Sequence, residues 1–191
     1  MPDTPQMHRR DVLKTLAVLA PARVLPANPL VSTLIGTGAA GYSDRQVANP
    51  YGLVIGPDRA LYFCDLDNQR IRRLDLRTRR TSTIAGNGTG TGEQGYSGDG
   101  DQARAAKLAG PKGLACGRDT LYVADTENHL IRAIDLKTGT IRTVLGTGVR
   151  GDGPEPDPLR CALARPHAVF VDARGTLYVG DSEAHRIRVL A

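Results

Sequence analysis

An aspartate and an arginine recur at a fixed separation in three stretches of the chain. In each pair the arginine follows the aspartate by seven positions: Asp65 and Arg72, Asp125 and Arg132, and Asp181 and Arg188. A carboxylate and a guanidinium on neighbouring strands can form a charge-assisted hydrogen bond that links the strands. A repeated structural contact is a simpler explanation than one reactive site repeated in every copy. We therefore interpret the three pairs as structural staples.

A second set of polar residues shares one position of the same repeats. His167 directly follows a proline, and the aligned residues in the other stretches are Tyr51 and Lys112. His129 and His185 share a different position, between two expected strands, where we expect them to be solvated or to cap a turn. Metal chemistry would need about three convergent ligands, and the first position supplies a single histidine. We therefore predict no catalytic residue and no metal site at this position.

The glycine-rich segments could also hold ions. Asp99 and Asp101 lie in one of them, Ser97-Gly-Asp-Gly-Asp101, which has the character of a calcium loop. The later glutamate of an EF-hand is missing, and no Gly-Lys-Ser/Thr sequence turns the glycines into a phosphate-binding loop. Glycines at turns explain these segments. We therefore expect no cofactor, with calcium at Asp99 and Asp101 as the alternative.

The strands that must position these residues appear in the sequence as a repeat. Its cores read Ala60-Leu-Tyr-Phe-Cys-Asp65, Thr120-Leu-Tyr-Val-Ala-Asp125 and Thr176-Leu-Tyr-Val-Gly-Asp181, and the arginines that follow them lie 60 and 56 residues apart. Short runs rich in Val, Ile, Thr and Tyr between Gly, Asp and Pro turns are typical of antiparallel strands joined by hairpins. This period predicts a propeller or a solenoid, and helix is expected to be scarce.

One copy of the repeat contains Asn128-His129-Leu130, and a linker contains Gly86-Asn-Gly-Thr-Gly90 followed by Gly95-Tyr-Ser-Gly-Asp-Gly100. In these residues the chain resembles the NHL-repeat family, with linkers similar to those of bacterial and teneurin-type NHL propellers. The resemblance covers residues 31–191. It implies an all-β fold, a β-propeller built of four-stranded antiparallel blades. The same fold carries unrelated activities, so it does not define the function.

Three NHL-type blades are expected, over about 50–86, 111–146 and 166–191. The third copy stops after its third strand, whereas residues 31–36 at the other end resemble the fourth strands of the first two copies. Closed rings need at least about four blades. The chain is therefore half of a six-bladed ring or a truncated propeller. In the first alternative, two chains close head to tail about a two-fold axis, and each N-terminal strand completes the third blade of the partner.

Residues 1–27 have the features of an export signal. Arg9 and Arg10 precede a short apolar stretch at 16–22, and Leu25-Pro-Ala27 offers a small-residue cleavage site. Paired arginines indicate the twin-arginine route, and the apolar stretch is shorter than the roughly 18 residues that span a bilayer. The alternative is a short amphipathic helix of a cytoplasmic protein. We predict a domain at 28–191 that is periplasmic or extracellular after export.

Charge and cysteine usage narrow the class of partner. The net charge is +5, and residues 1–27 contribute four basic and two acidic side chains, which leaves +3 for the rest. This charge is too mild for a dedicated nucleic-acid surface. The odd count of cysteines, Cys64, Cys116 and Cys161, argues against a disulfide framework. We expect them to be small buried side chains, with Cys161 the most exposed.

These observations favour an exported propeller that serves as a binding or protein-interaction module. The resemblance implies that Tyr51, Lys112 and His167 face the mouth of a central channel, where a protein, small-molecule or saccharide ligand would bind. It also implies an alternative, a lyase or lactonase-type hydrolase, because in related propellers a histidine after a proline at this place can line the channel. A truncated fragment of a longer NHL protein is a further alternative. We expect self-association that closes the ring, no nucleic acid and no stable membrane span.

Overall fold

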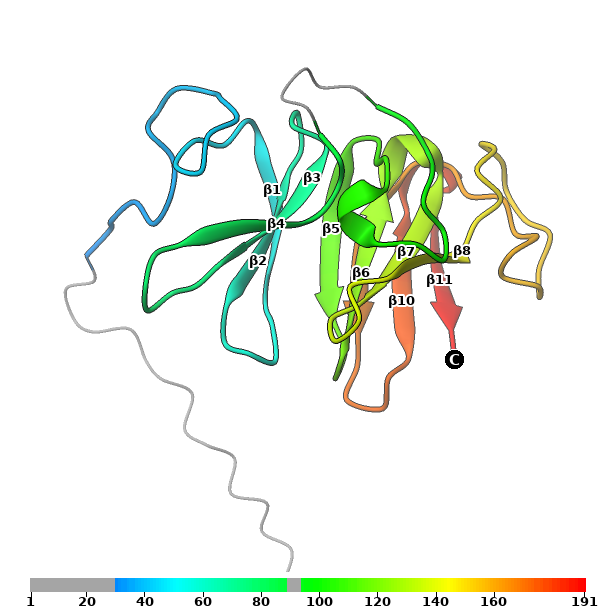
Figure 1. Ribbon diagram of the computed structural model, residues 1–191. Helices are drawn as coiled ribbons and strands as arrows, with labels where there is room; N and C mark the ends of the chain where they lie inside the picture. Colours follow the sequence, from blue (N-terminus) through cyan, green and yellow to red (C-terminus); the bar gives the residue numbers. More distant parts are fainter. Residues whose placement is uncertain (1–29, 89–93) are drawn as a thin grey trace, which may run out of the picture. The chain divides into compact units, whose positions relative to one another are not determined.

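Each copy of the sequence repeat folds into one antiparallel sheet, in which sequential strands are neighbours (Figure 1). The computed structural model describes residues 30–88 and 94–191. The first two sheets each have four strands: β1 (Pro50–Ile55), β2 (Leu61–Asp65), β3 (Arg70–Leu74) and β4 (Thr81–Ala85), then β5 (Pro111–Cys116), β6 (Thr120–Asp125), β7 (Leu130–Asp135) and β8 (Ile141–Leu145). The third sheet has β9 (Pro166–Val171), β10 (Leu177–Asp181) and β11 (Arg186–Leu190). The predicted fold class, a β-propeller of four-stranded antiparallel blades, is confirmed.

The three sheets, here called blades 1, 2 and 3, pack face to face through alternating side chains. Because successive strand residues point to opposite sides, Tyr62 and Cys64 of β2 face blade 2, and Leu61 and Phe63 lie on the opposite face. The core between blades 1 and 2 is formed by buried residues of both: Tyr62, Cys64, Ile71, Leu114, Leu121, Val123 and Ile134. The core between blades 2 and 3 repeats the arrangement with Ala124, Ile131, Ala133, Leu177 and Val179. Each fully buried large aliphatic side chain contributes about 1.5–3 kcal/mol to stability.

Within residues 30–88 and 94–191 the helical content is three single turns of 3-10 helix: η1 (Ala103–Ala105), η2 (Thr126–Asn128) and η3 (Ser182–Ala184). The latter two turns join the second and third strands of their blades, and each ends at a histidine in the left-handed conformation, with φ 56° at His129 and φ 54° at His185. Gln69 holds the same conformation in blade 1, with φ 52°. These side chains therefore start from turn-capping positions, on the same end of each blade as the first residue of its inner strand.

Among the helices of the described residues, none has the length and apolar character needed to cross a membrane.

Residues 31–36 form no strand within the single chain. The predicted strand therefore does not exist inside one copy, because no strand edge of its own chain lies beside it. Its pairing with the third blade of another copy stays a prediction.

The predicted order of cysteine exposure was wrong. Cys161 is buried at 3% exposure, Cys64 is fully buried, and Cys116 is the half-buried one. The segment before β9 folds back on itself through bridges such as Gly153 with Ala162. This fold-back places Cys161 in the core between blades 2 and 3, and the spacing of the cysteines gave no sign of it.

Candidate functional site

The three repeated aspartates are completely buried and anchor the segment that leads into each blade. Asp65, Asp125 and Asp181 each have 0% exposure. One carboxylate oxygen of each accepts the backbone N–H of the residue 16 or 17 positions earlier: Ala48 at 2.8 Å, Ala109 at 2.7 Å and Ala164 at 2.7 Å. Every blade therefore fastens the linker that precedes it.

The other carboxylate oxygen meets a guanidinium, and here the first blade departs from the repeat. Arg132 Nη1 lies 3.3 Å from Asp125, and Arg188 Nε lies 2.8 Å from Asp181. In blade 1 the nearer guanidinium is that of Arg70, at 2.7 Å from Asp65, and Arg72 is 3.8 Å away. The alignment gave no signal for Arg70, since blade 2 carries a leucine at that position.

The repeated arginines extend beyond their aspartates to the linker. Arg132 donates to the carbonyl of Ser97 at 3.0 Å and to Asp99 at 2.6 Å, and Arg188 reaches Asp152 at 2.6 Å. The arginines thus join the third strand of a blade to the linker that enters the same blade. Asp99, one of the two calcium candidates, is already paired with Arg132 and with the Tyr96 hydroxyl.

Lys112 and His167 come together at the ends of two adjacent inner strands. Lys112 on β5 places its Nζ 3.2 Å from Nε2 of His167 on β9. The backbones can approach because glycine follows the lysine: a Cβ on Gly113 would lie 2.7 Å from the His167 carbonyl. Gly52 has the same role one blade earlier, where a Cβ would lie 2.3 Å from the Lys112 carbonyl. The small residue after each candidate is therefore what brings neighbouring candidates side by side.

Tyr51 occupies the corresponding place on β1. Its side chain is 45% exposed, and in the part of the chain that the structure describes it makes no hydrogen bond to Lys112 or His167. The structure brings two of the three predicted ligand contacts together and leaves the tyrosine open to solvent.

A network of ion pairs surrounds the Lys112–His167 contact and was not foreseen from the sequence. Glu127 on η2 accepts from Lys112 at 3.4 Å and from Arg165 Nε at 2.9 Å. Arg165 also donates to Glu183 on η3 at 2.7 Å. Its backbone N–H donates to His129 Nδ1 at 3.1 Å. We call Lys112, Glu127, Arg165, His167 and Glu183 the inner-end cluster.

The surroundings of the inner-end cluster favour a neutral imidazole at His167 and at the adjoining His129. They favour charged carboxylates at Glu127 and Glu183. Partial burial, together with the charges of Lys112 and Arg165, lowers the pKa of His167. Burial likewise lowers the pKa of His129. The hydrogen bonds from Arg165 lower the pKa values of Glu127 and Glu183. A neutral imidazole can accept a hydrogen bond from the lysine ammonium, so the geometry at 3.2 Å fits this protonation state.

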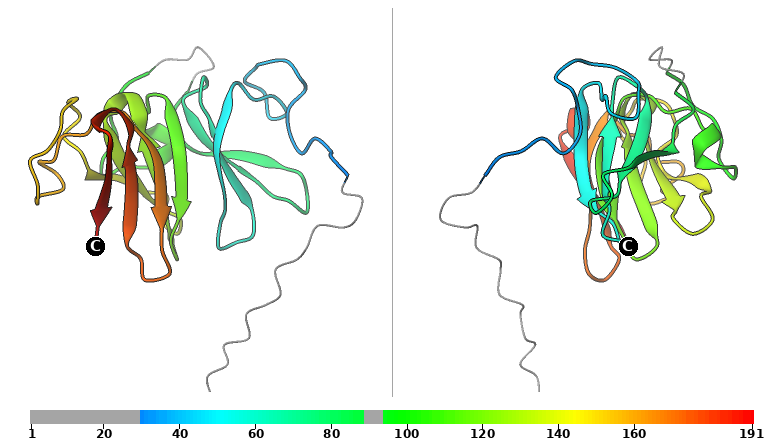
Figure 2. Two further views of the ribbon diagram at one scale, coloured as in Figure 1. Left: turned by 180° about the vertical axis from the view of Figure 1, so that it is seen from behind. Right: turned by 60° about the vertical axis from the view of Figure 1, so that its left-hand side comes forward.

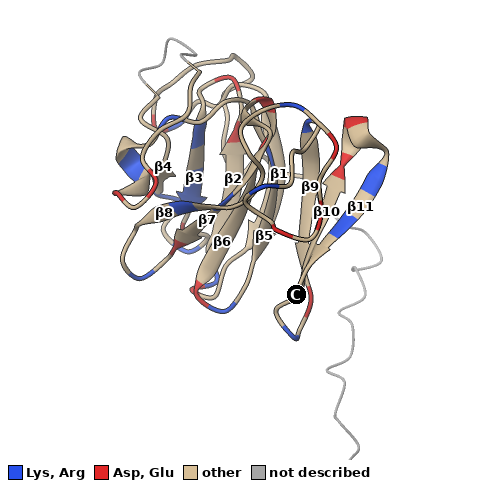
Figure 3. Cartoon of the chain, turned by 90° about the vertical axis from the view of Figure 1, so that its right-hand side faces the viewer, with Lys and Arg blue, Asp and Glu red and all other residues tan. Residues whose placement is uncertain are grey.

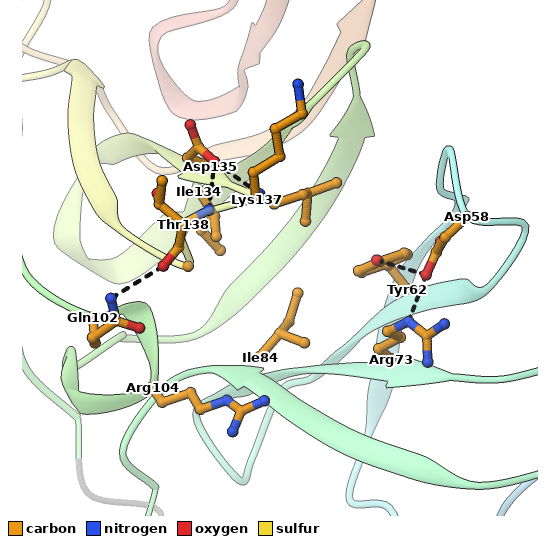
Figure 4. A pocket seen from close by; sticks show the side chains of 12 residues that line it. Asp58, Tyr62, Arg73, Ile84, Gln102, Arg104, Ile134, Asp135, Lys137 and Thr138 are labelled. Carbon is orange, nitrogen blue, oxygen red and sulfur yellow. Dashed lines mark hydrogen bonds and ion pairs between the residues drawn. The ribbon is translucent and has the colours of Figure 1, made fainter.

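A cavity of about 400 Å³ lies between the outer parts of blades 1 and 2 and has different walls. Figure 4 shows polar groups that line it and bond to one another: Asp58 to Arg73 at 2.6 Å, and the Gln102 side chain to the Thr138 carbonyl at 3.1 Å. Tyr62 adds a hydrogen bond to Asp58 at 3.3 Å. These contacts hold neighbouring strands and turns in place, so we favour the inner-end cluster as the candidate site.

Sequence comparison supports the NHL family. The family model of the NHL repeat matches residues 163–190, which contain strands β9 to β11. The third blade is an NHL repeat. Since blades 1 and 2 carry the same buried aspartate and the same linker contact, they share its construction.

This chain is similar to two curated proteins. It is 51% identical over 150 residues to human NHL repeat-containing protein 2, which is 75% of this chain and 21% of that protein. It is 38% identical over 118 residues to SUPPRESSOR OF QUENCHING 1, chloroplastic, of Arabidopsis thaliana, which is 61% of this chain and 10% of that protein. The chain spans about a fifth or less of the length of these relatives.

Solved structures match this chain at the level of fold. A structural genomics protein of unknown function from Bacteroides thetaiotaomicron superposes with a TM-score of 0.61 at 18% identity, over 69% of this chain and 32% of that chain. An auxiliary nutrient binding protein from Bacteroides ovatus gives 0.61 at 20% identity, over 75% and 37% of the two chains. At such identity the likeness shows the propeller fold and nothing of the ligand.

Proposed function

We propose that this NHL chain is an exported binding module whose ligand contacts the inner-end cluster. The observation that carries the proposal is the 3.2 Å contact between Lys112 Nζ and His167 Nε2 at the ends of two adjacent inner strands. Folding alone gives no reason to place a cation against an imidazole, because hydrophobic contacts already join blades 2 and 3. Donors gathered at the end of a propeller channel are suited to recognising a polar ligand.

The chemistry of the cluster favours a ligand that accepts hydrogen bonds. A lysine ammonium has three donors, and Glu127 and His167 occupy two of them. The remaining donor and the ring of His167 can meet a carboxylate or a sugar hydroxyl. Lys112, Glu127 and His167 are all partly accessible. A saccharide that bears a carboxylate offers both of these groups, and an acidic side chain of a protein ligand offers the carboxylate.

Nuclear magnetic resonance of the histidine rings tests this proposal on the full chain. We expect glucuronate to shift the His167 ring resonances, and glucose to shift them less. Lys112→Met should weaken the glucuronate response about tenfold, since a hydrogen bond to a charged group contributes about 1.5–3 kcal/mol. Lys137→Met is the matched control, because Lys137 is 71% exposed and pairs only with Asp119. Equal responses in both variants, or no response in the parent chain, would exclude the cluster as the site.

Export is the second part of the proposal. It is supported by the arginine pair at Arg9 and Arg10, the apolar stretch after it and the small-residue site ending at Ala27. These residues lie outside the part that the structure describes. Three free cysteines in the chain are compatible with the cytoplasm and with an exported location. The proposal of export therefore rests on the N-terminal signal.

A second candidate function is catalysis by a lyase or lactonase-type hydrolase. The observation that favours it is the lowered pKa of His167, which leaves a neutral imidazole. This imidazole could act as a general base once a substrate displaces Lys112 from Nε2. His167→Gln would then abolish turnover while glucuronate binding through Lys112 persists. Stoichiometric zinc or calcium in the purified protein would also favour this candidate over a simple binding module.

A further inference from the structure

Blade 3 presents an apolar face that has no partner in the described part of the chain. The side chains of Phe170, Tyr178, Ile187 and Val189 lie on one side of this blade and are 63%, 37%, 79% and 62% exposed. The aligned face of blade 1, with Tyr62 and Ile71, is buried against blade 2. β11 is an edge strand of its sheet, whose order is β11-β10-β9. No strand runs beside it in the left-hand view of Figure 2, and Figure 3 shows the basic residues that it carries. Blade 3 thus exposes the kind of surface on which blades 1 and 2 each receive a neighbour.

Blade 1 presents the complementary face. Leu53 is 66% exposed, and together with Leu34, Ile35, Val47 and Phe63 it lines an apolar hollow of about 430 Å³. The corresponding faces of blades 2 and 3 are filled by the preceding blade, through residues such as Leu114 and Val179. The two unpartnered faces are therefore the two halves of one blade-to-blade contact.

The segment before blade 1 contains the glycine turn that follows the fourth strand in the other blades. Gly36 has φ 107°, close to φ 89° at Gly86 and φ 108° at Gly146, the glycines that directly follow β4 and β8. All three glycines donate their N–H to a carbonyl of the linker ahead, at 3.1, 3.0 and 3.0 Å. The linker then ends, as in the other blades, with a backbone N–H bound to a buried aspartate. Residues 31–35 therefore precede this turn in the chain, as β4 and β8 precede theirs.

We propose that a second copy of this chain fills both vacancies, so that residues 31–35 of each copy add to β11 of the other. The register follows from the equivalent pairs Ile71–Ala85 and Arg72–Thr83, and Ile131–Leu145 and Arg132–Thr143. It places Ile35 opposite Ile187, Thr33 opposite Arg188, Ser32 opposite Val189 and Val31 opposite Leu190. Main-chain hydrogen bonds supply the affinity of such strand addition, and alternate side chains supply the register.

A second copy is the occupant that uses every vacancy at once. Each copy offers one fourth strand, one open edge and one of each face, so a two-fold axis satisfies all of them in a closed pair. The closed pair would bring Lys112 and His167 of both copies around one channel. This inference rests on blade geometry and is independent of whether the inner-end cluster binds a ligand.

Light scattering of the full 191-residue chain gives the first test. We expect a dimer that Thr33→Pro converts to a monomer, because proline removes the N–H that would bond to β11 and residue 33 is exposed outside any strand of its own chain. Thr33→Val is the matched control and should remain a dimer, since it keeps the N–H and the β-branch. A parent chain that stays monomeric at all concentrations, or that forms open-ended oligomers, overturns the proposal.

Disulfide trapping tests the register itself. Ser32→Cys with Val189→Cys should form an intermolecular disulfide on oxidation, since directly opposite residues have Cα atoms about 4.5–5.5 Å apart. Ser32→Cys with Ile187→Cys is two residues out of register and should cross-link at least tenfold more slowly. The three variants with only one added cysteine report any background from Cys116, which is half-buried. Equal trapping of both pairs, or trapping within one copy, overturns the strand exchange even if the chain is dimeric.

Discussion

At the scale of single residues, the molecule separates its charged groups into two tasks. The buried aspartates and their arginines hold each blade to its linker. The inner-end cluster joins strand ends and turns of blades 2 and 3, and its members remain partly accessible. The same residue types thus serve stability in one place and surface chemistry in the other, and burial is what distinguishes them.

Removing a staple carboxylate should strongly destabilise the fold. Asp125→Ala leaves the Ala109 N–H and the fully buried Arg132 without their partner, and breaking a buried ion pair costs about 3–5 kcal/mol. Asp119→Ala is the control, because Asp119 is 40% exposed in a surface pair with Lys137, where the loss is about 0–1 kcal/mol. Urea denaturation of both variants measures the difference, and two equal midpoints would contradict the structural role of Asp125.

The lowered pKa of His167 predicts a stability that falls in mild acid. The unfolded chain binds a proton near pH 6.5, and the folded chain binds it at lower pH because His167 is partly buried and lies close to the charges of Lys112 and Arg165. Between these two pKa values the unfolded state holds more protons, so stability decreases as the pH falls below 6.5 and levels off below the folded pKa. His167→Gln should flatten this dependence. Urea midpoints at pH 8 and pH 5.5 measure it, and His129→Gln gives the separate contribution of the other histidine.

At the scale of elements, glycine determines how closely the inner strands approach. Gly52 and Gly113 follow Tyr51 and Lys112, and a Cβ at either position would meet the backbone of the next inner strand. The third repeat uses Ala168, where no further blade of the described chain packs. The spacing of the inner strands depends on the absence of a Cβ at Gly52 and Gly113. The contact between Lys112 and His167 depends on that spacing.

A methyl group at Gly113 should therefore disturb both packing and site. Gly113→Ala places a Cβ 2.7 Å from the His167 carbonyl, and overpacking of this kind costs about 1–3 kcal/mol. We expect a lower urea midpoint together with a changed titration of His167, because β9 must move away from β5. Gly117→Ala is the control, as its Cβ would have no neighbour closer than 3.7 Å. An unchanged urea midpoint and an unchanged titration of His167 in Gly113→Ala would show that β5 and β9 accommodate the added methyl group.

The blades could be read from the sequence because each repeats one local pattern. The alternation in Leu61–Asp65 and its copies fixes which side chains face the neighbouring blade, and the aspartate at the strand end marks the staple. The inner-end cluster could not be read in the same way. Glu127, Arg165 and Glu183 come from turns and a linker, and their meeting depends on how two blades pack. The segment 31–36 shows the opposite limit, since its sequence predicts a strand and the structure has none there.

At the scale of the whole molecule, the export signal at the N-terminus can be tested separately from the propeller. If the paired arginines direct translocation, changing both Arg9 and Arg10 to lysine should retain the protein in the cytoplasm with residues 1–27 uncleaved. The reason is that lysine keeps the charge of the segment but not the arginine pair that the twin-arginine route reads. Fractionation and mass spectrometry measure this. A control that changes Arg23 to lysine should be exported and cleaved normally.

The fastening of each linker to the blade that follows it has a consequence for gene rearrangement. Since Asp125 and Arg132 hold residues 97–109 but nothing of the next linker, the natural joints of the chain fall at Gly36, Gly86 and Gly146. A segment cut between two such joints carries its own aspartate, arginine and linker. Duplicating or deleting it would leave no buried carboxylate without its partners. The number of blades can therefore change by whole units through a single recombination, while the chemistry inside each remaining blade stays intact.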